Sequence, residues 1–404
     1  MTKIMTPPLN NLKILDFSTL LPGPYATMIL ADLGADIIRI EAPNRPDLVR
    51  LLPPFSPDGQ SAQHSLLNRS KRSLGLNLKT AAAPEIIKQL ITRQKYDIIV
   101  EQFRPGVMER LGVGYEQLKE ECPSLIFCSL TGYGQSGPYK NRAGHDLNYL
   151  ALSGLLSYYG RQSSQTPPPP PPMQVADVGA GSLHLVIGLL AAIIRRMSTG
   201  EGGQVDIAMH DGALAWNAVG AAKWLVGGEN PQPEGELLNG GSFYDIYETK
   251  DGRYLSVAPL EPKFWHGFCQ AIGREDLFKP GTNFDAAHQQ TFKEEIQRAI
   301  SGKTMSEWQA IFAQLDVCVE PVLTTEEALA HPQTLARHMI VAVPMQDKAQ
   351  QQVGSPIKLS DHEPDYKFSG SALGQHSFEI LTEIGYTNRE IETLTANNVV
   401  AGPE

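Results

Sequence analysis

Cysteine is scarce in this chain and occurs only four times in 404 residues, at Cys122, Cys128, Cys269 and Cys318. No two of these positions have the CxxC spacing that is typical of a zinc or redox site. Their scatter also excludes the framework of a small disulfide-bonded protein. We therefore expect reduced thiols, a cytoplasmic location and no metal site.

An excess of basic charge is also absent, since 34 Lys and Arg stand against 44 Asp and Glu and give a formal net charge of −10. Broad binding to nucleic acid needs a basic surface that neutralises phosphates, so this class of function is disfavoured. A local basic pocket for a small phosphorylated ligand is still open.

Long hydrophobic runs are lacking, and the longest candidate, Leu183–Ile194, is interrupted by His184 and Gly188. From this interruption we expect no membrane span. The first residues, MTKIMTPPLNN, lack the charged and apolar regions of a signal peptide. The last residues, AGPE, carry no recognisable peroxisomal address.

What is present in the first half is an alternation of short apolar runs and helical patterns. Tyr25–Leu33 and Pro84–Arg93 have helical spacing. The expected strands are Leu12–Phe17, Asp36–Glu41, Asp97–Glu101 and Ser124–Leu130. This order predicts an α/β fold with a parallel sheet covered by helices. The first turn, LPGPYA, lacks GxGxxG, so NAD binding is disfavoured.

The length predicts two domains rather than one. Glycine and proline cluster after residue 225, so we expect a large domain over 1–225, a smaller one over 230–335 and a C-terminal part over 340–404. The run Pro167–Pro172 predicts an extended surface loop, followed by a long helix, apolar on most sides, that should lie in the core. Further predicted elements are helices at Lys263–Ile272, Met305–Leu315, His376–Ile384 and Asn388–Leu394, and strands at Gly252–Pro259 and Val317–Val322.

Three side chains are candidates for acid–base chemistry, and each also has a purely structural interpretation. Asp177 stands where the long helix should begin, so it is either a capping residue or a carboxylate directed at a ligand. His145 follows the glycine-rich TGYGQSGP and is either a base or one of 10 histidines with an ordinary role. Glu261 precedes Pro262 and suits the start of a helix equally well. Their spacing alone does not connect them.

Many blocks of the sequence, in order, resemble family III of the CoA-transferases, and specifically its α-methylacyl-CoA racemase branch. These blocks include LKILDFSTLLPGPYATMILADLGADIIRIEAP, NRSKRSLGLNLKT, EQFRPGVMERLGVG, TGYGQSGPYKNRAGHDLNYLALSGLL, QVADVGAGSLHLVIGLLAAI and LNGGSFYDIYETKDGRYLSVAPLEPKFW. The resemblance covers nearly the whole chain. It implies a Rossmann-like large domain, completed by the C-terminal part, a smaller α+β domain, and an interlocked-ring homodimer.

The resemblance also assigns residues. It implies that His145 and Asp177 are the two acid/base groups of a racemase, that Glu261 orients the histidine, and that Asp177 would instead be the nucleophile in a transferase. Residues of three segments are implied to bind CoA: Leu76, Asn77, Leu78, Lys79, Gln102, Phe103, Arg104, Gly144, Asp146, Leu147, Asn148 and Tyr149. Relatives often have arginine where this chain has Ala42, a gap that Arg39 or Arg45 could fill.

The expected reaction is the epimerisation of 2-methylacyl-CoA thioesters, in which one base removes the α-proton and another group returns a proton. Backbone N–H groups at the helix start near Asp177 are expected to bind the enolate oxygen. No metal or other cofactor is needed, since CoA is part of the substrate, and neither nucleic acid nor membrane is an expected partner. The alternatives are a CoA-transferase with an aspartyl-CoA intermediate and a non-catalytic acyl-CoA binding protein. The acyl group is left open.

Overall fold

Two compact units make up the chain in this computed structural model, which describes residues 6–57, 59–162, 167–281 and 285–402. Unit 1 consists of Met1–Ser153, Pro171–Trp216 and Leu335–Glu404, and unit 2 of Gly154–Pro170 and Asn217–Thr334. Unit 1 therefore joins the N-terminal half of the chain to its C-terminal end.

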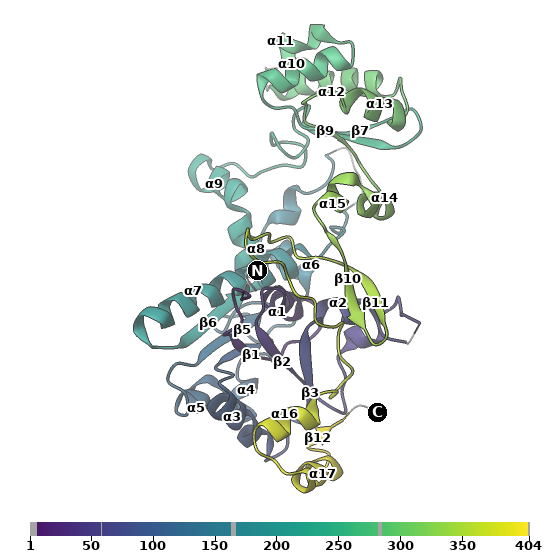
Figure 1. Ribbon diagram of the computed structural model, residues 1–404. Helices are drawn as coiled ribbons and strands as arrows, with labels where there is room; N and C mark the ends of the chain where they lie inside the picture. Colours follow the sequence, from purple (N-terminus) through teal and green to yellow (C-terminus); the bar gives the residue numbers. More distant parts are fainter. Residues whose placement is uncertain (1–5, 58, 163–166, 282–284, 403–404) are drawn as a thin grey trace. The chain divides into compact units, whose positions relative to one another are not determined.

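A seven-stranded sheet organises unit 1, with the strand order β12-β3-β2-β1-β4-β5-β6 (Figure 1). The strands are β1 (Lys13–Asp16), β2 (Asp36–Glu41), β3 (Lys71–Leu76), β4 (Ile98–Glu101), β5 (Ile126–Thr131), β6 (Gly203–Ala208) and β12 (Val400–Ala401). All neighbours are parallel except the edge strand β12, which is antiparallel to β3. The predicted α/β fold with a parallel sheet is confirmed.

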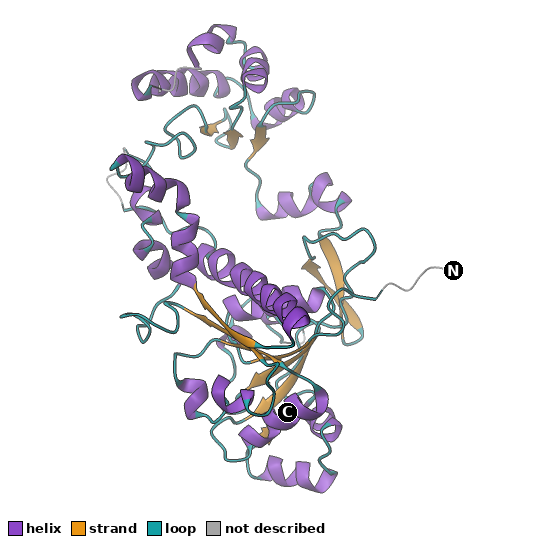
Figure 2. Ribbon diagram, turned by 90° about the vertical axis from the view of Figure 1, so that its left-hand side faces the viewer, coloured by secondary structure: helices purple, strands orange, loops and turns teal. Residues whose placement is uncertain are grey.

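Helices cover both faces of this sheet, as Figure 2 shows. One face packs against α3 (Ala83–Gln94), α16 (Ser377–Glu383) and α17 (Asn388–Ala396), with Ile86, Leu90 and Ile380 fully buried. The other face carries α1 (Pro22–Asp32) and α7 (His184–Thr199). Unit 1 also contains the short 3₁₀ helix η1 (Leu48–Leu51), α2 (Ala62–Leu67), α4 (Val107–Arg110), α5 (Tyr115–Lys119), α6 (Asp146–Leu152), α8 (Met209–Trp216), and the hairpin of β10 (Ile340–Met345) and β11 (Lys348–Val353).

The helix after Asp177 differs from its prediction. It opens with a π-helix, η3 (Val175–Leu183), and continues without a break into α7. His184 and Gly188 do not interrupt it, so by length and composition the 25 residues Val175–Thr199 are apolar enough to cross a membrane, although 44% of the apolar stretch is buried within the protein. The helix is also not a core helix on all sides. Ile187, Ile194 and Met197 are exposed on α7, at 63%, 68% and 82%.

Unit 2 is built on a three-stranded antiparallel sheet of β7 (Asp245–Glu248), β8 (Tyr254–Val257) and β9 (Val319–Pro321). Aromatic side chains dominate its core, where the Trp265 and Phe243 rings stack at 4.1 Å. Its helices are α9 (Ala218–Gly227), α10 (Pro262–Ala271), α11 (Phe278–Gly281), α12 (Ala286–Ile300), α13 (Met305–Phe312) and α14 (Thr325–Ala330); α15 (Pro332–Ala336) spans the return to unit 1.

The boundary between the units differs from the predicted one, since residues 154–170 and 217–225 belong to unit 2 rather than to the large domain. Ion pairs explain why the first of these segments, residues 154–170, belongs to unit 2. The Arg161 guanidinium binds Asp245 at 2.7 Å and Glu234 at 2.8 Å. The Tyr158 hydroxyl donates to Asn217 at 2.6 Å. These polar contacts join the segment before the proline run to residues that follow it by 59, 73 and 84 positions.

Candidate active site

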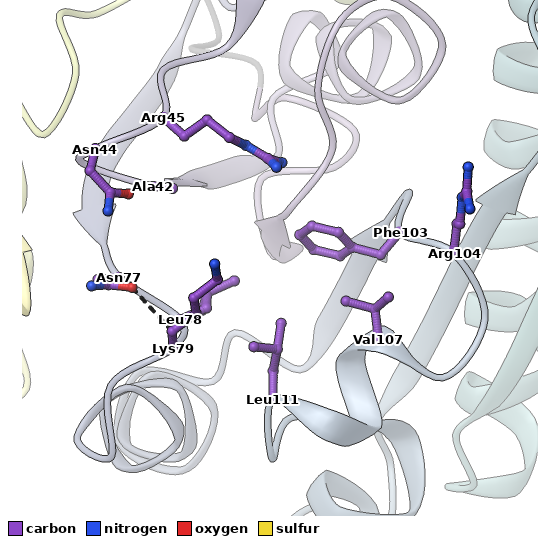
Figure 3. A pocket seen from close by; sticks show the side chains of 10 residues that line it. All are labelled: Ala42, Asn44, Arg45, Asn77, Leu78, Lys79, Phe103, Arg104, Val107 and Leu111. Carbon is purple, nitrogen blue, oxygen red and sulfur yellow. Dashed lines mark hydrogen bonds between the residues drawn. The ribbon is translucent and has the colours of Figure 1, made fainter. Parts of the chain in front are cut away.

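Two neighbouring cavities lie on unit 1, and we call them cavity A and cavity B. Cavity A has a volume of about 640 Å³ (Figure 3) and is lined by Ala42, Asn44, Arg45, Asn77, Leu78, Lys79, Phe103, Arg104, Val107 and Leu111. Cavity B has a volume of about 280 Å³ and is lined by Leu20, Pro22, Gln102, Phe103, Arg104, Pro105, Leu130, Thr131, Gly132, Tyr133, Lys140, Arg142, Ala143, Gly144, His145, Tyr149, Asp177 and Met209. Phe103 and Arg104 line both cavities, so one ligand can extend through the two.

The parallel sheet explains why these residues meet. Ala42 follows β2, Asn77 follows β3, Gln102 follows β4 and Gly132 follows β5, each directly after the last residue of its strand. The carboxyl ends of parallel strands lie at one edge of a sheet, where α/β proteins commonly bind ligands. Short loops from four strands therefore build the two cavities.

Cavity A is cationic. Arg45, Lys79 and Arg104 line it, and none of its described lining residues is acidic. In Figure 3, Arg45 and Lys79 extend into the cavity from opposite loops, and the Phe103 ring lies between them and Val107. Although the whole chain is net negative, this cavity offers a concentrated positive charge to an anionic ligand such as a phosphate.

The arginine missing at Ala42 has one available substitute. Arg39 cannot be that substitute, because its side chain is buried and is paired with Asp47 and Glu41. Arg45, which is as close to Ala42 in the sequence as Arg39 is, lines cavity A. The prediction that Arg39 could serve is therefore wrong, since its charge is neutralised within the protein.

Several residues that the resemblance assigned to CoA lie outside the linings of both cavities. Leu76 is fully buried in the hydrophobic core of unit 1, and Leu147 is 45% exposed. Asn148 accepts a hydrogen bond from the His145 N–H at 3.0 Å, and Asp146 binds the start of η3. The other assigned residues line one or both cavities: Asn77, Leu78, Lys79, Gln102, Phe103, Arg104, Gly144 and Tyr149.

His145 is the N-cap residue of α6 and lines cavity B with an exposed side chain. The preceding glycine is required here, because a Cβ atom at Gly144 would lie 2.7 Å from Tyr149 Cε1. The Tyr149 hydroxyl in turn donates to the Gly144 carbonyl at 2.5 Å. The buried Tyr149 thus fixes the backbone immediately before His145.

Asp177 lines the same cavity from the first turn of η3, where it is partly buried. Burial raises the pKa of its carboxyl to about 7, and the nearby Asp146 charge adds to the shift. Near neutral pH this carboxyl is therefore poised between its acid and base forms, as a proton-transfer group requires.

The glycines of VGAG allow the π-helix to pack closely. A Cβ atom at Gly179 would lie 1.8 Å from Trp216 Cη2, and one at Gly181 would lie 2.8 Å from Met209 Cγ. Both partners belong to α8. π-Helical turns are rare and occur often at functional sites. Here the turn carries Asp177 to the edge of cavity B.

Asp146 is the cap of η3, and this observation changes two predictions. Its Oδ1 accepts hydrogen bonds from the N–H groups of Ala176 at 2.7 Å and Asp177 at 3.0 Å, while the N–H of Val178 donates to the Gln174 carbonyl. Asp177 is therefore not a capping residue. These N–H groups are also already paired, so the prediction that they bind an enolate oxygen is wrong.

We expect Asp146→Ala to lower kcat by about tenfold to a hundredfold, because two N–H groups at the start of η3 lose their acceptor and Asp177 is no longer held in place. Asp146→Asn keeps an acceptor oxygen but removes the charge, so the pKa of Asp177 should fall. Its kcat at neutral pH should change less, and the acidic limb of the pH–rate profile should move to lower pH. Asp211→Asn, at an exposed carboxylate of α8, is the control. If wild type and Asp146→Asn had the same pH–rate profile, the charge of Asp146 would not influence the pKa of Asp177, and this role of Asp146 would be contradicted.

Glu261 belongs to unit 2, as the N-cap residue of α10, and Pro262 opens that helix as predicted. Its side chain is exposed and makes no capping hydrogen bond. It is therefore not held by a structural partner within the part of the chain that the structure describes.

Residues beyond the predicted set also line the site. Tyr133 packs edge-on against Tyr149 at 5.3 Å, and Lys140 and Arg142 precede His145 in cavity B. Lys140 and Arg142 stand in the same loop as the quoted GHD motif, so proximity in sequence was a usable signal. No group of three or more His, Cys, Asp or Glu side chains with metal-binding geometry occurs among the described residues.

Comparisons with known proteins identify the family of this chain. Residues 9–377 match the family model CoA-transferase family III. The chain is 33% identical to the alpha-methylacyl-CoA racemases of Mus musculus and Homo sapiens, over 97% of each chain, and 34% identical to the succinyl-CoA:mesaconate CoA-transferase of Haloarcula marismortui, over 94% of this chain and 98% of that one. A CaiB/BaiF family protein from Brucella suis has a similar structure, with a TM-score of 0.81 and 27% identity over 93% of this chain and 99% of that one. The chain therefore belongs to family III of the CoA-transferases, an enzyme family whose members similar to it include both racemases and transferases.

Proposed function

We propose that this protein epimerises 2-methylacyl-CoA thioesters by removing and returning the α-proton. The observation that carries the proposal is that His145 and Asp177, which are 32 positions apart, line one small cavity. That cavity shares Phe103 and Arg104 with the cationic cavity A. Two proton-transfer groups beside an anion-binding cavity suit an acyl-CoA, whose phosphates lie far from its reacting carbon.

The proposal places the CoA phosphates in cavity A and the thioester in cavity B. Arg45, Lys79 and Arg104 supply charge-assisted hydrogen bonds to phosphate oxygens. The apolar side chains of Leu78, Phe103 and Val107 give the uncharged parts of CoA a surface to pack on. Phe103 and Arg104 then mark the passage from one cavity to the other.

Inversion at the α-carbon needs two groups, one on each face of that carbon. In the proposal, one of His145 and Asp177 removes the α-proton, and the other returns a proton to the opposite face. A carboxyl with a pKa of about 7 serves in either direction, because both of its forms are populated at neutral pH. The resemblance assigns Glu261 a supporting role towards the histidine, and the proposal retains it.

An enolate oxygen develops as the proton leaves, and its charge must be stabilised. The N–H groups of Ala176 and Asp177 are occupied by Asp146. Lys140 and Arg142 line cavity B and form no ion pair within the described part of the chain. In the proposal these two cations, rather than the helix start, neutralise the enolate.

The direct test uses one epimer of a 2-methylacyl-CoA in deuterated water. Wild-type protein should incorporate one deuterium at the α-carbon and convert the substrate to a mixture of both epimers, without any added carboxylic acid. Mass spectrometry and chiral chromatography measure the two outcomes. The proposal would be overturned if no branched acyl-CoA ester of a panel showed either α-proton exchange or formation of the other epimer.

A second candidate is a CoA-transferase with Asp177 as the nucleophile. It is supported by the transferases among the similar proteins, including the formyl-CoA:oxalate CoA-transferase of Escherichia coli, which is 31% identical. This reaction requires a second carboxylic acid and passes through an aspartyl-CoA thioester. Trapping that thioester with hydroxylamine, together with turnover that depends on an acceptor acid, would favour the transferase.

We also propose that two chains associate in a cytoplasmic homodimer. The exposed apolar side chains of Ile187, Ile194 and Met197 on α7 support this proposal, because large apolar side chains that are exposed together on one helix are often covered by a partner. Light scattering should give twice the mass of one chain, and Ile194→Glu with Met197→Glu should shift it towards the monomer. Ser198→Glu, at an exposed polar position of the same helix, is the control. A monomer at micromolar concentration would contradict the proposal.

A further inference from the structure

Glu101 is a buried carboxyl that the proposed reaction does not use. It is the last residue of β4, is 4% exposed, and lines neither cavity. Its Oε2 accepts a hydrogen bond from the Phe103 N–H at 2.8 Å. The Ser129 hydroxyl, directly opposite on β5, donates a second hydrogen bond to the carboxyl. The carboxyl thus ties the loop after β4 to the sheet.

That loop contributes to both cavities. Phe103 and Arg104 line cavity A and cavity B, and Gln102 lines cavity B. The Gln102 side-chain carbonyl also accepts a hydrogen bond from the Gly23 N–H at 3.1 Å, in the first turn of α1. The backbone of residues 102–104 therefore sets the positions of three side chains around the ligand site.

We propose that Glu101 is a positioning residue for the acyl-CoA site, acting through the Phe103 backbone to hold Phe103 and Arg104 where both cavities need them. The inference rests on the proposed function only in taking a CoA thioester as the ligand. Glu101 touches no substrate in this scheme. Its contribution is the orientation of the loop that does.

An isosteric apolar residue at position 101 would leave the partly buried Phe103 N–H without its acceptor. A buried donor without a partner is unfavourable, so the loop would adopt conformations in which the N–H reaches water. Phe103 and Arg104 would move with it. Binding of CoA would weaken, whereas His145 and Asp177 belong to α6 and η3 and would keep their positions.

The charge of Glu101 provides a second readout. Burial raises the pKa of this carboxyl to about 7, the Ser129 and Phe103 hydrogen bonds oppose the shift, and Glu109 on α4 and Asp206 on β6 add to it. A further titratable neighbour, the Cys128 thiol on β5, has a pKa raised by burial and stays neutral. Below pH 7 the carboxyl is neutral and resembles an amide. Above pH 7 the carboxylate accepts a stronger, charge-assisted hydrogen bond and should hold the loop more firmly.

The test measures binding of free CoA by calorimetry at pH 6 and pH 8. Glu101→Leu should raise the Kd about tenfold, the effect of losing one buried hydrogen bond. Glu101→Gln should match wild type within about twofold at pH 6 and bind about threefold more weakly at pH 8. Comparison with wild type at each pH cancels the titration of the CoA phosphates. Glu116→Gln, at an exposed carboxylate of α5 that lines neither cavity, is the control and should stay within about twofold of wild type.

Kinetics separate positioning from general stability. Glu101→Leu should raise KM with little change in kcat, whereas partial unfolding would lower the active fraction and hence kcat at constant KM. If Glu101→Leu does not fold, the Kd values of Glu101→Gln at pH 6 and pH 8 still test whether Glu101 positions the loop. An unchanged Kd for Glu101→Gln at both pH values, or for a folded Glu101→Leu, would overturn the inference. CoA binding can be measured without turnover. An absence of epimerisation would therefore contradict the proposed reaction but would leave the inferred role of Glu101 in CoA binding unaffected.

Discussion

Asp177→Asn is expected to lower the epimerisation rate by about 1,000-fold, because an amide of the same shape neither removes nor supplies a proton. The new side chain would still fit the first turn of η3, where the N–H groups of Ala176 and Asp177 bind Asp146. Binding of CoA in cavity A should stay within about twofold, since Asp177 does not line that cavity. Chiral chromatography of the acyl-CoA measures the rate, and calorimetry with free CoA is the control.

The same substitution should raise the melting temperature at pH 8. Burial and the Asp146 charge raise the pKa of Asp177 from 3.8 to about 7 in the folded protein. The folded state therefore holds this proton more tightly than the unfolded state, and stability is lost as pH rises from about 4 through 7. Asparagine avoids that loss, so the difference from wild type should grow between pH 4 and pH 8. An inactive variant that is also less stable at pH 8 would mean that the loss of activity reflects unfolding.

Four strands of the sheet, β1, β2, β4 and β5, were predictable because each carries a short, mainly apolar run, whereas β3, β6 and β12 were not predicted. Asp36–Glu41 was predicted with the boundaries that β2 has in the structure. β3 was missed because it begins with Lys71 and Arg72, and a basic pair is typical of a surface loop. Lys71 is nevertheless fully buried, since its ammonium binds Asp16 at 3.3 Å and Thr27 at 2.6 Å. Such pairing across 55 positions is invisible to a local pattern.

The chemistry of the site was predictable only in part, for a similar reason. A local pattern marked Asp177 as the cap of its own helix, whereas the cap is Asp146, which is 31 positions earlier. Arg39 and Arg45 looked equivalent in the sequence, yet one is buried in an ion pair and the other lines cavity A. The resemblance named His145 and Asp177, and the sheet edge explains how they reach one cavity.

His145→Gln is expected to lower the epimerisation rate by a factor similar to that of Asp177→Asn. It should nevertheless leave exchange of the α-proton intact for one of the two epimers. In the two-base scheme Asp177 remains able to remove the proton that faces it and to return deuterium to the same face. One epimer should therefore exchange with retention of configuration, and the other should not exchange. Mass spectrometry of each pure epimer, incubated separately in deuterated water, measures this asymmetry.

The pattern should reverse in Asp177→Asn, where the imidazole is the remaining base and serves the opposite face. This reversal separates the two-base scheme from its competitors, because a single shared base predicts that one variant exchanges both epimers and the other neither. A transferase would show no exchange in either variant or in wild type. Since His145 and Asp177 enter cavity B from different elements, α6 and η3, each can be removed without displacing the other. Loss of exchange for both epimers in both folded variants would therefore exclude independent action of the two groups and, with it, the proposed mechanism.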